Sequence, residues 1–156
     1  MRPRRILFCT DFSENSVLAG QYALDFAKIF NSGLLVLHVL KAPQDMQPAL
    51  PGDAAFDVQR DLLSNIEEDI KRNLEKIRVK MVEDYEDVST YQRRGVPVTE
   101  IMNFVKDLSI DLIVMGTHGR TGLKHLVMGS CAQNVVRMAK CPVLTVKPRD
   151  SRNPFL

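Results

Sequence analysis

Four short apolar runs are the feature that most constrains how this chain can fold. They occupy residues 6–9, 34–40, 112–115 and 143–146, with the sequences ILFC, LLVLHVL, LIVM and VLTV. Each has the length of a β-strand and little polar alternation, which is typical of parallel strands covered on both faces. A fifth segment, 88–93, alternates and is mostly polar, so we expect it to form a strand at the edge of the sheet.

Helical periodicity fills the intervals between these runs. Apolar residues recur at steps of three and four over 13–31 and 53–83, then after Pro97 and again after Ser130. Strand and helix therefore alternate four times before a last strand. This order predicts right-handed crossovers and an α/β fold, a doubly wound five-stranded parallel sheet with helices on both faces. The single apolar stripe of 53–83 predicts a helix that covers the sheet.

The length and composition fit one globular domain over residues 1–156. The chain has 156 residues, of which 45% are hydrophobic and 26% charged, as expected for a soluble protein with its own core. Residues 41–52 hold three prolines without periodicity, which predicts a mobile loop. The tail 148–156 is predicted to be frayed.

Charge and cysteine content disfavour several classes of protein. The net charge of +2, from 21 basic and 19 acidic residues, argues against nucleic acid or an anionic membrane as the main partner. No apolar run approaches the ~20 residues of a membrane span, and the basic start is not followed by a signal-peptide core. Cys9, Cys131 and Cys141 match no metal-ligand spacing. We expect reduced thiols in a cytoplasmic protein.

Two segments that follow strands carry unusual chemistry. The first apolar run is followed by Thr-Asp-Phe-Ser at 10–13, and the run at 112–115 by three glycines within 116–122. Open parallel sheets bind ligands at these carboxyl ends, where the winding reverses. Glycines let a backbone approach a ligand closely, and the helix N-terminus at Gly129-Ser130 favours an anion. The alternative is that the glycines only shape turns and Ser130 only caps the helix.

Several phosphate-handling motifs are missing. The chain has no Gly-Lys-Ser/Thr triplet of a P-loop and no G-x-G-x-x-G fingerprint. Residue 13 is serine, so a paired-carboxylate phosphatase site is absent, and 93–95 lacks the aspartate of a receiver domain. His118-Gly119 does not extend into a nucleotidyl-transferase signature. These enzyme and switch hypotheses are disfavoured.

The spacing Gly116-x₂-Gly119-x₉-Gly129-Ser130 resembles the nucleotide-binding signature of the ATP-binding universal stress proteins. The resemblance extends to TDFSE at 10–14, LHV at 37–39 and CPVL at 141–144, and covers about 4–147. It implies the strand order 3-2-1-4-5, with a crevice between the first and fourth strands that Asp11 and Gly116 flank.

The resemblance also implies a set of ATP-binding residues. Thr10, Asp11 and the Val39 backbone are expected at the adenine and ribose end, and Met115 and Gly116 further along the ribose. The residues expected around the phosphates are His118, Gly119, Gly129, Ser130, Cys131 and Ala132, with Arg120 neutralising the outer phosphate. Any Mg²⁺ is expected to be held mainly by the phosphates. We expect no catalytic residue and at most slow hydrolysis.

Simpler roles compete with some of these assignments. Asp11 could be only the cap of the following helix, and His38 is expected to be a hydrogen-bonded core histidine rather than a ligand. A helix N-terminus can lower the pKa of a thiol. We nevertheless expect Cys131 to be a packing residue rather than a nucleophile. Lys124 and His125 are expected to be solvated.

The last strand would lie at a sheet edge, and a bare apolar edge invites pairing with another chain. Universal stress proteins commonly form dimers through this strand. The resemblance thus implies a homodimer through Val143, Leu144, Thr145, Val146 and Lys147. The leading hypothesis is an ATP-binding regulatory module of the stress response. The alternative is a nucleotide-free dimeric interaction protein on the same fold. Release of adenine nucleotide from the denatured protein would rule out this alternative.

Overall fold

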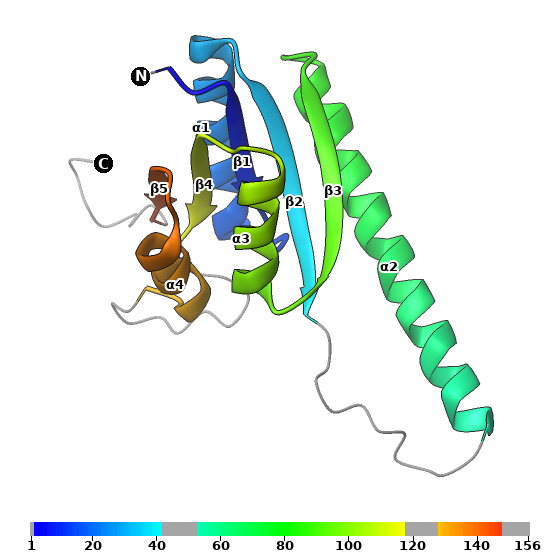
Figure 1. Ribbon diagram of the computed structural model, residues 1–156. Helices are drawn as coiled ribbons and strands as arrows, with labels where there is room; N and C mark the ends of the chain where they lie inside the picture. Colours follow the sequence, from blue (N-terminus) through cyan, green and yellow to red (C-terminus); the bar gives the residue numbers. More distant parts are fainter. Residues whose placement is uncertain (1, 42–52, 118–127, 148–156) are drawn as a thin grey trace, which may run out of the picture.

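The computed structural model describes residues 2–41, 53–117 and 128–147, and their side chains except those of 53–59. Five strands alternate with four helices in these ranges (Figure 1). Their order along the chain is β1 (Arg5–Cys9), α1 (Glu14–Phe30), β2 (Gly33–Lys41), α2 (Asp53–Val82), β3 (Val88–Gly95), α3 (Pro97–Asp107), β4 (Leu112–Gly116), α4 (Ser130–Met138) and β5 (Val143–Val146).

The five strands form one parallel sheet in the order β3-β2-β1-β4-β5. This confirms the predicted fold class and strand order, including β3 at an edge. In the register of the sheet, Leu7 lies between Leu35 of β2 and Ile113 of β4. The chain winds outward from β1 to β3 and then returns past β1 to β4. The point where the winding reverses is therefore the junction of β1 and β4.

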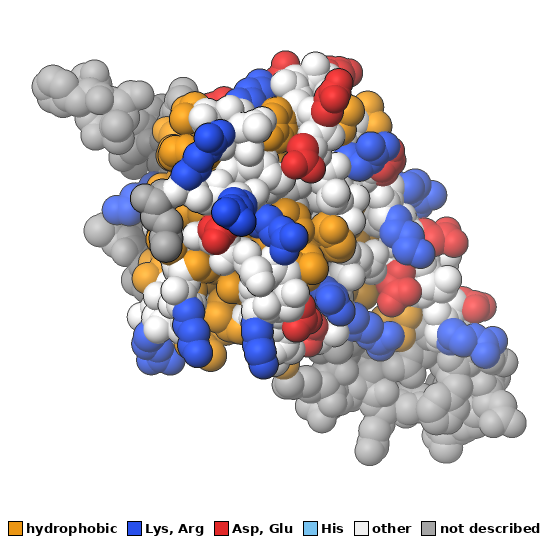
Figure 2. Space-filling view, turned by 45° about the horizontal axis from the view of Figure 1, so that its top comes forward, with side chains coloured by type: hydrophobic (Ala, Val, Ile, Leu, Met, Phe, Trp, Pro, Cys, Tyr) orange, Lys and Arg blue, Asp and Glu red, His pale blue; other side chains and the backbone are white. Residues whose placement is uncertain are grey.

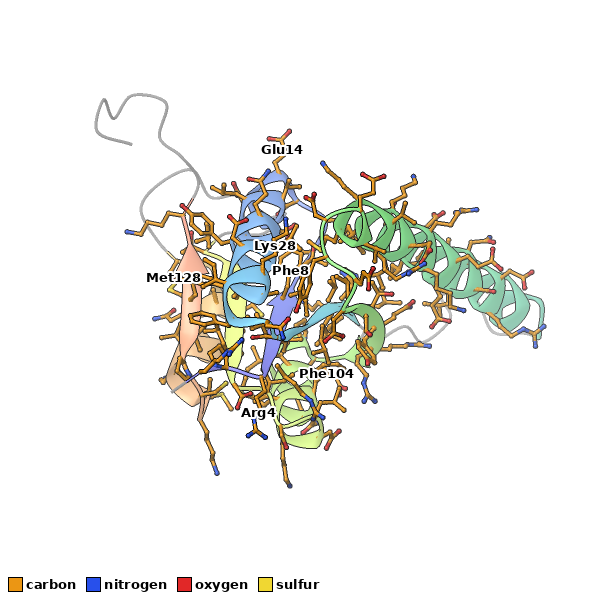
Figure 3. The ribbon with its side chains drawn as sticks, turned by 90° about the horizontal axis from the view of Figure 1, so that it is seen from above. Arg4, Phe8, Glu14, Lys28, Phe104 and Met128 are labelled. Atoms are coloured by element: carbon orange, nitrogen blue, oxygen red, sulfur yellow. The ribbon has the colours of Figure 1, made fainter. Side chains whose placement is uncertain are left out.

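Alternation along the strands divides the core between two helix layers. Ile6 and Phe8 face α1 and α2, whereas Leu7 faces α3 and α4. Phe8 and Phe104 lie on opposite sides of the sheet, as Figure 3 shows from above. Because both faces are covered, the central strands read as unbroken apolar runs.

Helix α2 covers the sheet with only part of its length. Ile70 and Leu74 are buried, at 6% and 3% exposed, but Leu62 is 50% exposed. The N-terminal part of α2 extends past the end of β3 (Figure 1). A 30-residue helix is about 45 Å long, whereas the 8 residues of β3 span about 26 Å. The prediction of a sheet-covering helix is thus wrong for its N-terminal part.

Local signals set the helix ends close to their predicted positions. Ser13 caps α1, its side chain accepting from the Ser16 N–H, and Asn31 ends the helix in the left-handed region with φ 52°. Pro97 occupies the first turn of α3, where its missing N–H costs nothing. Lys41, predicted as the start of the loop 41–52, is instead the last residue of β2, where it is paired with Gly95 of β3. The rest of that loop, 42–52, and the predicted frayed tail, 148–156, lie outside the described residues.

Within the described ranges, no helix combines the length and the apolarity that a bilayer crossing requires. The face seen in Figure 2 mixes Lys and Arg side chains with Asp and Glu. This mixture agrees with a net charge of +2.

The two parts of α2 should differ in their sensitivity to truncation. We expect Leu74→Ala to lower the free energy of unfolding by about 2–5 kcal/mol, because it leaves a cavity against the sheet. Leu62→Ala should cost about 0.5 kcal/mol or less, because its side chain is half exposed. Urea unfolding of the two variants tests this difference, and equal losses would contradict the described burial of α2.

Candidate functional site

A cavity of about 420 Å³ opens at the carboxyl ends of the central strands. Its wall is built from the ends of β1, β2 and β4 and from the first turns of α3 and α4. Of the twelve predicted site residues, nine line it: Thr10, Asp11, Val39, Met115, Gly116, Gly129, Ser130, Cys131 and Ala132. The other three, His118, Gly119 and Arg120, lie outside the described residues, as do Lys124 and His125.

Sequence reasoning missed part of the wall. Nine further residues line the cavity: Cys9, Ser16, Leu37, His38, Leu40, Lys41, Pro97, Ile101 and Thr117. Pro97 and Ile101 could have been found, because the first turn of a helix that follows a parallel strand lies at the same edge as the strand ends. Together with Val39 they make one end of the cavity largely apolar. Lys41 also lines the cavity, and the Leu40 side chain packs on the opposite core. The glycine and serine at the start of α4 make the other end polar.

The Asp11 carboxylate lies between these two ends, because β1 is between β2 and β4. Its Oδ1 accepts hydrogen bonds from the Ser13 N–H at 3.1 Å and the Ser13 hydroxyl at 2.6 Å. Ser13 is the N-cap of α1. The alternative that Asp11 is itself the helix cap is therefore wrong. Asp11 instead accepts hydrogen bonds from the capping residue and lines the cavity.

A buried polar network supports the turn that carries Asp11. The Thr10 hydroxyl lies 3.0 Å from that of Ser16 and accepts from the Phe12 N–H at 3.1 Å. His38 Nδ1 lies 2.8 Å from the Thr10 carbonyl oxygen. Because a carbonyl only accepts, Nδ1 carries the proton. The prediction of a hydrogen-bonded core histidine is confirmed for His38, which is 8% exposed. His38 is also among the residues that line the cavity.

The N-terminus of α4 faces the cavity, and within the described ranges its N-cap residue provides no side-chain cap. Gly129 is the N-cap and makes no side-chain hydrogen bond, and Ser130 is the first helical residue. The alternative that Ser130 only caps this helix is therefore wrong. The first N–H groups of a helix have no acceptor within it and carry the positive end of its dipole. Ser130, Cys131 and Ala132 of this first turn line the cavity.

The segment that holds the predicted glycine motif begins and ends at this cavity. The Gly129 N–H donates to the Thr117 carbonyl oxygen at 2.8 Å, so the two ends of residues 117–129 are tied together. Thr117 also donates its N–H to the Val146 carbonyl oxygen at 2.9 Å, which continues the sheet past β4. The positions of both ends are thus fixed by main-chain bonds.

A second, more open hollow of about 540 Å³ lies at the other end of the sheet. Its lining includes Glu83, Asp84, Glu86 and Asp87, so its charge repels an anion. The described residues contain no group of three or more side chains that could hold a metal ion.

The three cysteines are free thiols and pack against the core under α3 and α4. Burial, and then the Asp11 charge, raises the pKa of Cys131. The pKa of Cys9 is also raised, first by burial and then by the neighbouring Cys131 and Cys141. The net direction at Cys131 is therefore a raised pKa, and not the lowered one that a helix N-terminus can produce. This agrees with the expectation that it is a packing residue and not a nucleophile.

These pKa directions predict slow alkylation of the native thiols. At pH 8 we expect Cys131 to react with iodoacetamide more slowly than free cysteine, because less of it is thiolate. Its rate should still rise steeply above pH 9, whereas that of free cysteine levels off near its ordinary pKa of about 8.5. Cys9 should react only after unfolding in urea. Peptide mass mapping over time measures each site, and a Cys131 rate that levels off by pH 8 would show a lowered pKa.

Comparison with known proteins agrees with this geometry. The universal stress protein MJ0531 of Methanocaldococcus jannaschii is 35% identical over 147 residues, which cover 92% of this chain and 82% of that protein. The solved structure of MJ0577 has a TM-score of 0.83 and 28% identity, covering 97% of this chain and all of that one. MJ0577 belongs to the same organism.

Two further solved universal stress proteins share the fold at lower identity. One is in complex with cAMP, with a TM-score of 0.67 and 20% identity over 94% of this chain and 98% of that one. The other, from Archaeoglobus fulgidus, is in complex with dAMP, with a TM-score of 0.64 and 18% identity over 94% of this chain and 100% of that one. The model of the universal stress protein family matches residues 3–147, and the chain belongs to that family.

Proposed function

We propose that this protein binds ATP in the cavity between β1 and β4 and acts as a nucleotide-dependent regulatory module of a stress response. The observation that carries the proposal is the order of chemistry along the cavity wall. An apolar end, a carboxylate and an uncapped helix N-terminus follow one another on adjacent elements. This order matches the base, sugar and phosphates of a nucleotide.

The base would lie at the apolar end. Val39 lies near the end of β2, and Pro97 and Ile101 line the same end of the cavity from the first turns of α3. Main-chain groups at the end of β2 would recognise the edge of adenine, as expected for Val39. Asp11, in the turn that follows the neighbouring strand β1, would accept hydrogen bonds from the ribose hydroxyls. Met115 and Gly116 would continue this wall along the ribose.

The phosphates would lie at the N-terminus of α4. Main-chain N–H groups of Ser130, Cys131 and Ala132 would bind them, helped by the helix dipole. Gly129 would line the phosphates without donating its N–H, which is bonded to the Thr117 carbonyl oxygen. The sequence adds His118, Gly119 and Arg120, within a segment whose ends are tied together beside the cavity. Mg²⁺ would be held by the phosphates themselves. The volume of about 420 Å³ lies within the range of about 300–1,000 Å³ typical of ligand pockets.

Hydrolysis would be slow at most. Among the described residues that line the cavity, Asp11 is the only carboxylate, and it lies in the turn after β1, at the proposed sugar end. A general base must be within hydrogen-bond reach of the attacking water. The bound nucleotide would therefore act mainly as a conformational ligand. The universal stress proteins solved with cAMP and dAMP support an adenine nucleotide as the ligand class.

We also propose a homodimer through β5. The Pro142 and Val146 carbonyl oxygens accept from β4 at 3.0 and 2.9 Å. By the alternation of a strand, Val143 and Thr145 turn their main-chain groups away from β4. Helix α1 contacts β5 and exposes two apolar side chains, Tyr22 at 42% and Ile29 at 70%. By helical spacing, both lie on a different flank of α1 from Lys28, which pairs with Asp84 after α2.

ATP binding is tested by calorimetric titration of the nucleotide-stripped protein. We expect Asp11→Asn to weaken ATP binding by about tenfold, because a charged acceptor of the ribose hydroxyls is lost. Asp25→Asn makes the same charge change on the exposed face of α1 and should bind like the wild type. A wild-type protein that releases no adenine nucleotide on denaturation and takes up no ATP would leave the nucleotide-free interaction protein as the better account.

The dimer is tested by a matched pair of charges on α1. Ile29→Glu should shift the protein toward monomer in sedimentation velocity, because the partner would have to bury a carboxylate. Val17→Glu should leave the association unchanged, because Val17, 57% exposed, lies on the α2 side of the same helix. A wild-type monomer at micromolar concentration, or equal effects of the two variants, would contradict the proposed interface.

A further inference from the structure

Phe12 has an unfavourable backbone conformation that no helix end explains. Three non-glycine residues in the described ranges have positive φ: Phe12 at 63°, Asn31 at 52° and Ser109 at 49°. Asn31 and Ser109 follow the last turns of α1 and α3, where the left-handed conformation is common. Phe12 precedes a helix instead, and a bulky side chain is rare in this region. Its surroundings must therefore hold it there.

Two contacts hold Phe12 in this conformation. Its ring stacks on that of His38, with centroids 4.4 Å apart and planes at 22°. Its N–H donates to the Thr10 hydroxyl at 3.1 Å. His38 is itself fixed by the bond from Nδ1 to the Thr10 carbonyl oxygen at 2.8 Å. The stack thus joins the turn after β1 to β2, the next strand.

Phe12 lies between two elements of the proposed site without being part of it. Thr10, Asp11 and His38 line the cavity, but Phe12 does not; its side chain packs on the opposite core, under α1 and α2. The residue on its other side, Ser13, donates both its N–H and its hydroxyl to Asp11. A change of the Phe12 backbone would therefore move the carboxylate of Asp11 relative to the cavity.

We propose that Phe12 is a positioning residue: its stacking on His38 holds the turn 10–13 in the one conformation that presents the Asp11 carboxylate to the sugar of the nucleotide. This inference rests on the proposed ATP site. The strained turn is stabilised before the ligand arrives, so binding does not have to order it. Phe12 touches no ligand in this scheme and acts through Asp11.

A double-mutant cycle between Phe12 and Asp11 tests this role. Phe12→Ala should weaken ATP binding about tenfold in calorimetry, and it should change affinity by less than about twofold when Asp11→Asn is already present. Phe12→Tyr keeps the stack and should bind like the wild type. Leu24→Ala is the control, because Leu24 of α1 packs on the same core as Phe12. This variant should lower the midpoint of thermal unfolding without lowering the affinity for ATP.

The outcomes separate positioning from general support of the fold. Equal losses of affinity with and without Asp11→Asn, or no loss with Phe12→Ala, would overturn the positioning role while leaving the ATP site intact. If Phe12→Ala does not fold, Phe12→Leu, which keeps apolar bulk but not the aromatic stack, takes its place with the same expectations. A wild-type protein that binds no ATP would overturn both proposals, and that result is visible before any variant is made.

Discussion

The pairing of β1 with both β2 and β4 is the constraint on which the rest of the structure depends. β1 is only five residues long, yet Leu7 and Phe8 have strand neighbours on both sides. The ladder continues past its end, where the Thr10 N–H donates to the Leu37 carbonyl oxygen at 3.0 Å. Because parallel strands end at the same edge, this pairing brings three chain segments together: the turn after β1, the end of β2 and the end of β4.

This edge combines apolar burial with polar groups that must be satisfied. Thr10, Ser16 and His38 are 6%, 3% and 8% exposed, and leaving such groups without partners would be costly. Their mutual hydrogen bonds remove that cost and also restrict the backbone of the turn. The same burial raises the pKa of Cys9 and keeps it a neutral packing residue. A site built on these residues is rigid on its β1 and β2 side.

Much of this arrangement could be predicted from patterns that act locally. The apolar runs predict strands because a strand buried on both faces shows no polar alternation. Pro97 and Ser130 indicate helix starts because both residue types are favoured at the first positions of a helix. The overhang of α2 could not be predicted, because periodicity reports which face is apolar and not how far the partner sheet extends. The sequence also could not show that Ser13 caps α1 while Asp11 lines the cavity, since either side chain can cap a helix. The sequence does not indicate the left-handed conformation of Phe12, because that conformation depends on His38, 26 residues away in sequence.

The two sides of the cavity therefore differ in what fixes them. On the β1 and β2 side, side chains from separate strands hydrogen-bond and stack with one another, as Phe12 and His38 do. On the β4 and α4 side, main-chain bonds join Thr117 to Gly129 and to Val146. Val146 belongs to the strand of the proposed dimer edge. The N-terminus of α4 is thus joined to β5 through two main-chain hydrogen bonds, one from Gly129 to Thr117 and one from Thr117 to Val146. A ligand at the phosphate end of the proposed site would act beside the first of these bonds, which gives a physical route from that end to the proposed dimer edge.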